Sequence, residues 1–284
     1  MMLWIAGGQG MLGSSLQVLC QEKRVAYVAT THQEVDIENK DAVLEYAKQV
    51  QPSHIINCVA YTDVDGAEEH LKKALAVNAE GAYHLALAAR AVCARLIHLS
   101  TDYVFDGQKM NSYLETDPCS PINGYGMSKW QGEQQVLKAY PEACVIRTSW
   151  LFGGKGKNLI SSLLKWMQEK PHIQVVANQR GSPTFCRDLG EAILELLECK
   201  GVIHFANQGA VSRYQMALDI WELLKRKNAP LLCKHIEPVQ SDQFPTPAKR
   251  PAYSVLDTGK YKHITGKEPR SWKEAMENYV NELA

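Results

Sequence analysis

The chain has 284 residues, of which 45% are hydrophobic and 22% are charged, and its 31 Lys and Arg balance 31 Asp and Glu. This near-average globular composition excludes a mainly disordered chain, and the zero formal charge disfavours nucleic acid and anionic membranes as partners, because both select basic surfaces. No apolar run reaches the ~18 residues of a membrane span, and the first run breaks at Gly7, so we expect neither a membrane segment nor a signal peptide.

The eight cysteines and nine histidines are spread along the chain, without a C-x-x-C pair or the spacing of metal ligands. Several cysteines fall inside apolar runs such as IINCVA. We therefore expect buried free thiols, a cytoplasmic location and no metal site.

The first two thirds of the chain alternate short apolar runs with helical patterns. Strands are predicted at 3–6, 25–30, 54–60, 95–100 and 144–150, and helices at 11–21, 40–50, 68–93 and 128–140. The strands are apolar on both faces and are separated by helices, a pattern typical of a parallel sheet covered on both sides. The expected fold class is therefore α/β, a doubly wound parallel sheet of Rossmann type.

The alternation becomes less regular after about residue 150. Helices are predicted at 158–169, 185–199, 214–227 and from about 272, and strands at 173–177 and 202–206, while 230–251 is a proline-containing segment. We expect residues 1–150 to form a dinucleotide-binding domain, joined by returning elements around 173–227. Residues 151–284 are expected to form mainly a smaller substrate-binding lobe over the carboxyl edge of the sheet, where such sheets bind ligands.

A glycine-rich turn separates the first predicted strand from the first predicted helix. Gly7, Gly10 and Gly13 allow a tight turn and a close backbone approach to a pyrophosphate at the helix N-terminus. This placement favours a dinucleotide over a merely structural turn. The second strand is followed by Thr31, His32 and Gln33 rather than by an acid, so the choice between NADPH and NADH stays open.

Two further patterns suit a reduction. Tyr125 and Lys129 are four residues apart and share one face of a helix, where an ammonium near a phenol lowers the phenol pKa. Thr101, Asp102 and Tyr103 end the fourth predicted strand, where a hydroxyl can reach a substrate carbonyl in the ligand crevice. Each pattern alone has a structural explanation, a chance pair or a strand-ending turn, but their order after a glycine-rich turn favours an enzyme.

Eight sequence blocks occur in an order that covers nearly the whole chain. They include GGQGMLG, NCVAYTDVDGAEE, HLSTDYVFDG, PINGYGMSKWQGE, VIRTSWLFGGKGKN and RPAYSVLD. In wording and order they resemble the dTDP-4-dehydrorhamnose reductase family of the extended short-chain dehydrogenase/reductase superfamily.

The resemblance implies a role for each matching position. It implies a catalytic triad of Thr101, Tyr125 and Lys129. Cofactor contacts are implied for Gly7, Gly10, Met11, Leu12, Gly13, Asp36, Ile37, Ala60, Tyr61, Thr62, Tyr125 and Lys129. Substrate contacts are implied for Val64, Thr101, Asp102, Tyr103, Tyr125, Trp150 and Arg250. Arg250 would meet a diphosphate, although a core Trp150 and a surface Arg250 are the structural alternatives.

The implied reaction is hydride transfer from NADPH or NADH to the C4 ketone of dTDP-6-deoxy-L-lyxo-4-hexulose, with Tyr125 as proton donor. The implied partners are the nucleotide-sugar substrate and a possible second copy in a homodimer, and the implied role is to supply rhamnose for polysaccharide. A 4,6-dehydratase is disfavoured, because Asp102 is followed by Tyr103 and not by the glutamate of that family. An epimerase and a regulatory subunit resembling the methionine adenosyltransferase β subunit remain alternatives.

Overall fold

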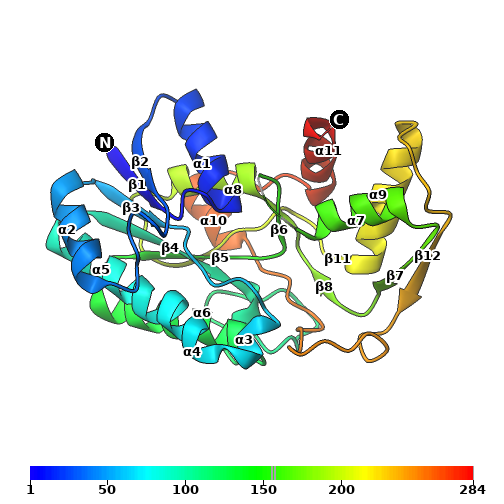
Figure 1. Ribbon diagram of the computed structural model, residues 1–284, viewed down its shortest axis with the longest axis horizontal. Helices are drawn as coiled ribbons and strands as arrows, with labels where there is room; N and C mark the ends of the chain where they lie inside the picture. The colour runs from blue at the N-terminus through cyan, green and yellow to red at the C-terminus, as the bar shows by residue number, and fades with distance from the viewer. Residues whose placement is uncertain (155, 157, 284) are drawn as a thin grey trace.

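Six parallel strands form the central sheet of the computed structural model, which describes residues 1–154, 156 and 158–283 (Figure 1). The strand order is β10-β5-β4-β3-β1-β2, and every neighbouring pair is parallel. The strands span Met2–Ala6 (β1), Ala26–Thr30 (β2), His54–Asn57 (β3), Arg95–Thr101 (β4), Cys144–Thr148 (β5) and Gly201–His204 (β10). This arrangement confirms the predicted doubly wound α/β fold.

Helices cover both faces of the sheet because successive strand residues point to opposite sides. On β1, Leu3 and Ile5 pack with one helix layer, whereas Trp4 and Ala6 pack with the other. The first layer contains α1 (Met11–Glu22), α8 (Cys186–Glu195) and α10 (Gly259–Thr265). The second contains α2 (Lys40–Val50), α5 (Ala82–Ala91) and α6 (Gly124–Ala139).

The predicted helix over 68–93 is wrong as a single element. It is divided into α3 (Gly66–Glu69), α4 (Leu71–Leu75), the π-helix η1 (Ala76–Gly81) and α5. His70 leaves the helical region at φ −117° and ψ 41°, between α3 and α4. The wider turn of η1 contains Asn78, whose side chain bonds outside its own helix, and π-turns of this kind are frequent at functional sites.

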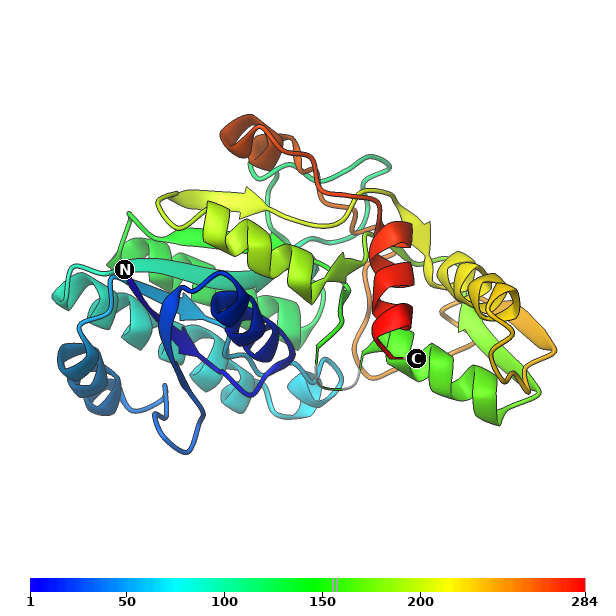
Figure 2. The same ribbon diagram turned by 90° about the horizontal axis from the view of Figure 1, so that it is seen from above.

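The segment after residue 150 divides between the sheet and a C-terminal lobe. Strand β10 and helix α8 belong to the sheet and its cover. The C-terminal lobe is built around a second core of side chains from α7 (Leu159–Glu169), β7 (His172–Val176), α9 (Arg213–Arg226), β12 (His235–Val239) and α11 (Trp272–Glu282). Figure 2 shows α11 between the sheet and the rest of the lobe.

Three short strand pairs complete the lobe and its junction with the sheet. They are β6 (Leu151–Phe152) with β9 (Thr184–Phe185), β8 (Arg180–Gly181) with β11 (Val211–Ser212), and β7 with β12. A short 3-10 turn, η2 (Asp102–Val104), follows β4. Strand β12 lies in the proline-containing segment 230–251, for which no element was named: Ile236 and Val239 are buried beside β7, a signal that the prolines of this segment obscure.

The cysteines only partly follow the expectation of buried thiols. All eight are free, and Cys20, Cys144, Cys186 and Cys233 are buried. Cys93 is exposed, because it lies in the turn between α5 and β4 with a left-handed φ of 55°. Within the described residues, no helix is long and apolar enough to cross a bilayer.

Candidate active site

A cleft of about 690 Å³ lies at the carboxyl ends of the parallel strands. Its walls come from the turn after β1, the loops after β3, β4 and β5, the start of α6 and the first residue of α9. The predicted site residues that line it are Gly10, Met11, Leu12, Ala60, Thr62, Val64, Thr101, Asp102, Tyr103, Tyr125, Lys129 and Trp150. Two lysines of the GGKGKN block, Lys155 and Lys157, lie outside the described residues.

The glycine-rich turn has the form that a dinucleotide phosphate requires. Gly7 has a φ of +86°, and a Cβ on Gly13 would lie 2.2 Å from the Gly7 carbonyl oxygen, so neither position tolerates a side chain. Gly10 caps α1 without any side-chain hydrogen bond to the first helical turn. The open backbone N–H groups and the helix dipole therefore suit an anionic pyrophosphate.

The three predicted catalytic residues meet at one end of the cleft. Thr101 ends β4, while Tyr125 and Lys129 lie on consecutive turns of α6. Helix α6 begins four residues before its predicted start, because Asn123 caps it by accepting a 2.7 Å hydrogen bond from the Gly126 N–H. A Cβ on Gly126 would lie 2.1 Å from the Tyr103 carbonyl oxygen, so glycine lets the helix approach β4.

Lys129 is fully enclosed beneath the cleft. Its Nζ donates a 2.6 Å hydrogen bond to the Leu99 carbonyl oxygen. Burial lowers the pKa of this ammonium to about 8, against the opposing effect of the Glu133 carboxylate one helical turn away.

Tyr125 is only partly buried, since it lines the cleft, but the removal of its phenol from water raises the phenol pKa above the ordinary value, while a hydrogen bond with Thr101 acts in the opposite direction. The sequence predicts that Lys129 lowers this pKa, but here the ammonium is bonded to the Leu99 carbonyl and burial prevails. The phenol is therefore neutral at physiological pH, the protonation state of a proton donor.

The hydroxyl of Thr101 is held by its own neighbours. It donates a 3.1 Å hydrogen bond to Asp102 Oδ1 and accepts one of 3.2 Å from the Tyr103 N–H. Burial raises the pKa of Asp102 to about 6, and its other oxygen, Oδ2, is buried without a hydrogen-bond partner among the described residues. Tyr103 packs edge-on against Tyr125, with ring centroids 5.8 Å apart.

A buried ion pair behind the triad is one feature that the sequence analysis missed. Glu133 accepts a 2.7 Å hydrogen bond from Arg147 Nη2 and another from the Ser100 hydroxyl. Arg147 also lies 3.4 Å from His204, whose pKa is lowered to about 3 by burial and by that guanidinium. The only sequence signal is the position of Glu133 one turn after Lys129 on the same helix.

Asn78 was also missed, and it connects the loop after β3 to α6. Its Oδ1 accepts a 2.8 Å hydrogen bond from the Tyr61 N–H, while its Nδ2 donates to the Tyr61 carbonyl and to the Ser128 hydroxyl. Tyr61 itself does not line the cleft. The two predicted contacts at its sides, Ala60 and Thr62, do.

Three more predicted residues lie away from the cleft lining. Ile37 is buried, with its carbonyl accepting a 2.8 Å hydrogen bond from the His84 ring. Asp36 lies at the surface beside His32, 3.4 Å away. Arg250 is held by Asp65 through two hydrogen bonds of 2.7 and 2.6 Å. Asp36 and Ile37 therefore lie apart from the triad, whereas Arg250 lies outside the cleft lining but close enough to Tyr103, which lines the cleft, to affect the pKa of its phenol.

Trp150 lines the cleft and has a left-handed backbone conformation, with a φ of 45°. A Cβ on Gly181 would lie 2.5 Å from its ring, so that glycine makes room for the indole. The guanidinium of Arg213, a residue that the sequence analysis did not single out, lies 4.9 Å from the ring centroid. Such strained conformations persist where the surroundings fix them, often at ligand sites.

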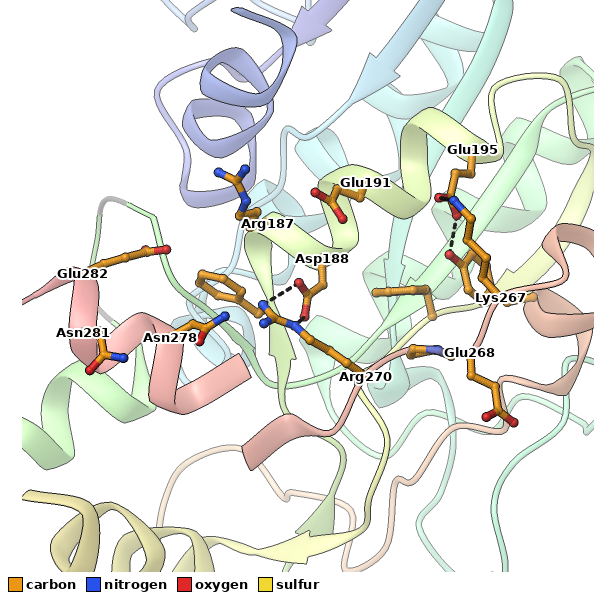
Figure 3. Close-up of a pocket in the computed structure, with 14 residues that line it drawn as sticks. Arg187, Asp188, Glu191, Glu195, Lys267, Glu268, Arg270, Asn278, Asn281 and Glu282 are labelled. Atoms are coloured by element: carbon orange, nitrogen blue, oxygen red, sulfur yellow. Dashed lines mark hydrogen bonds and ion pairs between the residues drawn. The ribbon is translucent and has the colours of Figure 1, made fainter. Parts of the chain in front are cut away.

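A second cleft, of about 600 Å³, lies between α8 and the segment leading into α11 (Figure 3). It shares no residue with the first cleft. Two ion pairs lie within it, Asp188 with Arg270 at 2.8 Å and Glu195 with Lys267 at 2.5 Å. Within the described residues, no group of three His, Cys, Asp or Glu side chains is placed to hold a metal ion.

Comparisons with known proteins show the family of the chain. The family model described as "RmlD substrate binding domain" matches residues 1–284. The dTDP-4-dehydrorhamnose reductase of Aggregatibacter actinomycetemcomitans is 37% identical, over 97% of each chain. That of Mycobacterium tuberculosis (strain ATCC 25618 / H37Rv) is 40% identical, over 96% of this chain and 90% of its own.

A solved structure of a dTDP-4-dehydrorhamnose reductase has the same fold as this chain. The Bacillus anthracis dTDP-4-dehydrorhamnose reductase, crystallised in complex with NADP, has a TM-score of 0.93 and 34% identity over 99% of both chains. With a family model and relatives above 30% identity that span nearly their whole length, the chain belongs to the dTDP-4-dehydrorhamnose reductase family.

Proposed function

We propose that this chain reduces the 4-keto group of dTDP-4-dehydrorhamnose with NADPH or NADH, to give dTDP-rhamnose. The observation that carries the proposal is one cleft in which Thr101, Tyr125 and Lys129 lie beside a glycine-rich helix N-terminus that has no side-chain cap. The names of the relatives supply the substrate, and the NADP of the Bacillus anthracis structure supplies the cofactor class.

The residues present fit such a cofactor. Gly10, Met11 and Leu12 would hold its pyrophosphate at the N-terminus of α1, and Ala60 and Thr62 would follow it along the loop after β3. When bound, the cofactor supplies the hydride that reduces the carbonyl carbon.

The chain's own side chains then handle the charge on the carbonyl oxygen. As that oxygen becomes negative, the neutral phenol of Tyr125 donates a proton to it, and the Thr101 hydroxyl orients it. The Lys129 ammonium, held on the Leu99 carbonyl, adds positive charge below the phenol and stabilises the phenolate that remains. Thr101 and Lys129 are buried and Tyr125 is partly buried, and the reduced access of water strengthens these interactions.

The proposal is tested by incubating the purified chain with dTDP-4-dehydrorhamnose and with NADPH or NADH, and following loss of the reduced nicotinamide. We expect stoichiometric oxidation of the cofactor and formation of dTDP-rhamnose. Conversion of the sugar without net oxidation would point to an epimerase. Cofactor binding without any sugar conversion, accompanied by a changed activity of a partner enzyme, would point to a regulatory subunit.

A further inference from the structure

One arginine in the cleft, Arg213, takes no part in the proposed proton and hydride transfer. Arg213 is the first residue of α9, and it is the only arginine among the described residues that line the cleft. Its guanidinium covers the Trp150 ring at 4.9 Å, and its Nη2 lies 3.4 Å from the Tyr103 hydroxyl. Its Nε is buried without a hydrogen-bond partner among the described residues.

An unpartnered buried donor is costly, so native structures reserve such groups for a ligand or an ordered water. Two other buried polar atoms of the cleft, Asp102 Oδ2 and Thr148 Oγ1, also have no partner among the described residues. Of the five such atoms among the described residues, three therefore belong to residues that line the same cleft as the triad, which points to a polar ligand there.

Arg250 is the contrasting case. Asp65 binds both of its terminal nitrogens, at 2.7 and 2.6 Å, and the Ala248 carbonyl accepts a further hydrogen bond of 2.7 Å. Its charge is neutralised before any ligand arrives. Arg213 forms no ion pair with a described carboxylate. The nearby Asp102 is no exception, because burial raises the pKa of its carboxyl by more than the Arg213 guanidinium lowers it.

We propose that Arg213, and not Arg250, is the guanidinium that binds the diphosphate of the nucleotide-sugar substrate. The proposal rests on the proposed function, and it names the residue that recognises the anionic part of that substrate. A guanidinium presents a planar fork of donors that matches phosphate oxygens. Stacking on Trp150 fixes the plane of the fork, so little side-chain entropy is lost on binding. The N-terminus of the 14-residue helix α9 adds positive potential at the same place.

The test measures binding, so that it does not depend on turnover. Calorimetry with the full chain, saturated with NADP, compares dTDP with thymidine, which has the same base and sugar but no phosphate. For Arg213→Met, which keeps an apolar stem on Trp150, we expect dTDP to bind about 10- to 100-fold more weakly, the usual effect of losing a charge-assisted hydrogen bond. Thymidine and NADP affinities should not change, and Arg213→Lys should recover part of the dTDP affinity.

Two matched variants serve as comparisons. Arg226→Met removes an exposed arginine at the other end of α9, where it pairs with Glu277, and should leave dTDP binding unaltered. Arg250→Met tests the assignment that the sequence suggested, and we expect a much smaller loss of dTDP affinity than for Arg213→Met.

The inference is overturned if Arg213→Met binds dTDP as tightly as the unsubstituted chain, or if Arg250→Met shows the larger loss. It is also overturned if thymidine and dTDP weaken equally, because the arginine then only supports the shape of the cleft. The proposed function fails separately: a chain that binds dTDP through Arg213 but does not reduce the ketosugar keeps the inference and loses the proposed reaction.

Discussion

At the scale of single residues, burial sets the protonation states that a reductase needs. Tyr125 stays neutral because the removal of its phenol from water opposes loss of the proton, and the buried Lys129 has a pKa lowered to about 8. The Y-x-x-x-K spacing correctly placed both side chains on one helix face, but spacing carries no information about burial. For that reason the sequence predicted a lowered tyrosine pKa, whereas the structure gives a raised one.

Replacing Tyr125 by Phe removes the proposed proton donor while keeping the ring that packs against Tyr103. We expect kcat to fall by about 10²- to 10⁴-fold, the usual contribution of a general acid, with little change in cofactor affinity. Steady-state kinetics with NADPH titrations will check this. Tyr140→Phe, at the end of the same helix, is the matched control and should keep full activity. If Tyr125→Phe has the same kcat as the unsubstituted chain, Tyr125 is not the proton donor.

The lowered pKa of Lys129 predicts a pH dependence of stability. The pKa of the folded chain is about 8 against 10.5 in the unfolded chain, so between these values the unfolded state holds more protons. Unfolding free energy should therefore rise with pH in this window, by at most about 1.4 kcal/mol per pH unit from this group. Denaturant titrations of the ligand-free chain and of Lys129→Met from pH 7 to 10.5 measure the difference. If the unfolding free energies of the two proteins change in parallel with pH, the pKa of Lys129 is not lowered.

At the scale of elements, the glycine-rich turn and the start of α6 position the site. The start of α6 was predicted four residues too late, since the cap formed by Asn123 was not recognised. The glycine-rich turn could be predicted from the sequence, because glycine spacing acts locally. The interruption at η1 could not, since it depends on Asn78 reaching Tyr61 and Ser128, which are distant in sequence. Strand β12 was missed for a related reason: its register comes from pairing with β7 and not from its own pattern.

Gly13→Ala tests the turn directly. The added methyl group would lie 2.2 Å from the Gly7 carbonyl oxygen, so the β1–α1 turn must shift. We expect a loss of about 1–3 kcal/mol in unfolding free energy, as for other overpacked sites, and weaker binding of NADPH. Gly190→Ala in α8, where the nearest neighbour lies at 3.3 Å, is the control and should bind NADPH normally. If Gly13→Ala binds NADPH as the unsubstituted chain does, the turn does not hold the cofactor.

The buried pair of Glu133 and Arg147 ties α6 to β5, with side chains only 0% and 4% exposed. Glu133→Gln leaves the Arg147 charge buried without a counter-charge, so we expect a loss of about 3–5 kcal/mol in unfolding free energy, measured by chemical denaturation. Glu169→Gln breaks an exposed pair with Lys165 and should change stability by no more than about 0.5 kcal/mol. Similar losses for both variants would contradict the importance of the buried pair.

At the scale of the whole molecule, the parallel sheet and the C-terminal lobe together bring residues from separate segments to one cleft. The parallel strands and the helices between them could be predicted, because apolar runs alternate with helical patterns, but the order of the strands in the sheet was not predicted. Arg213 could not be predicted, since α9 reaches the cleft only through the packing of the C-terminal lobe. Arg250 was placed in the cleft by resemblance, but its bond to Asp65 depends on a distant loop that no local pattern indicates.

The central claim is that this chain delivers hydride from a nicotinamide cofactor to the C4 carbon of dTDP-4-dehydrorhamnose. The most direct measurement is a turnover with NADPH carrying deuterium at both C4 positions of the nicotinamide, followed by mass spectrometry and NMR of the sugar product. The account predicts dTDP-rhamnose with a single deuterium, located at C4 of the sugar. A sugar product without deuterium, or no sugar product from a chain that binds both ligands, would contradict it.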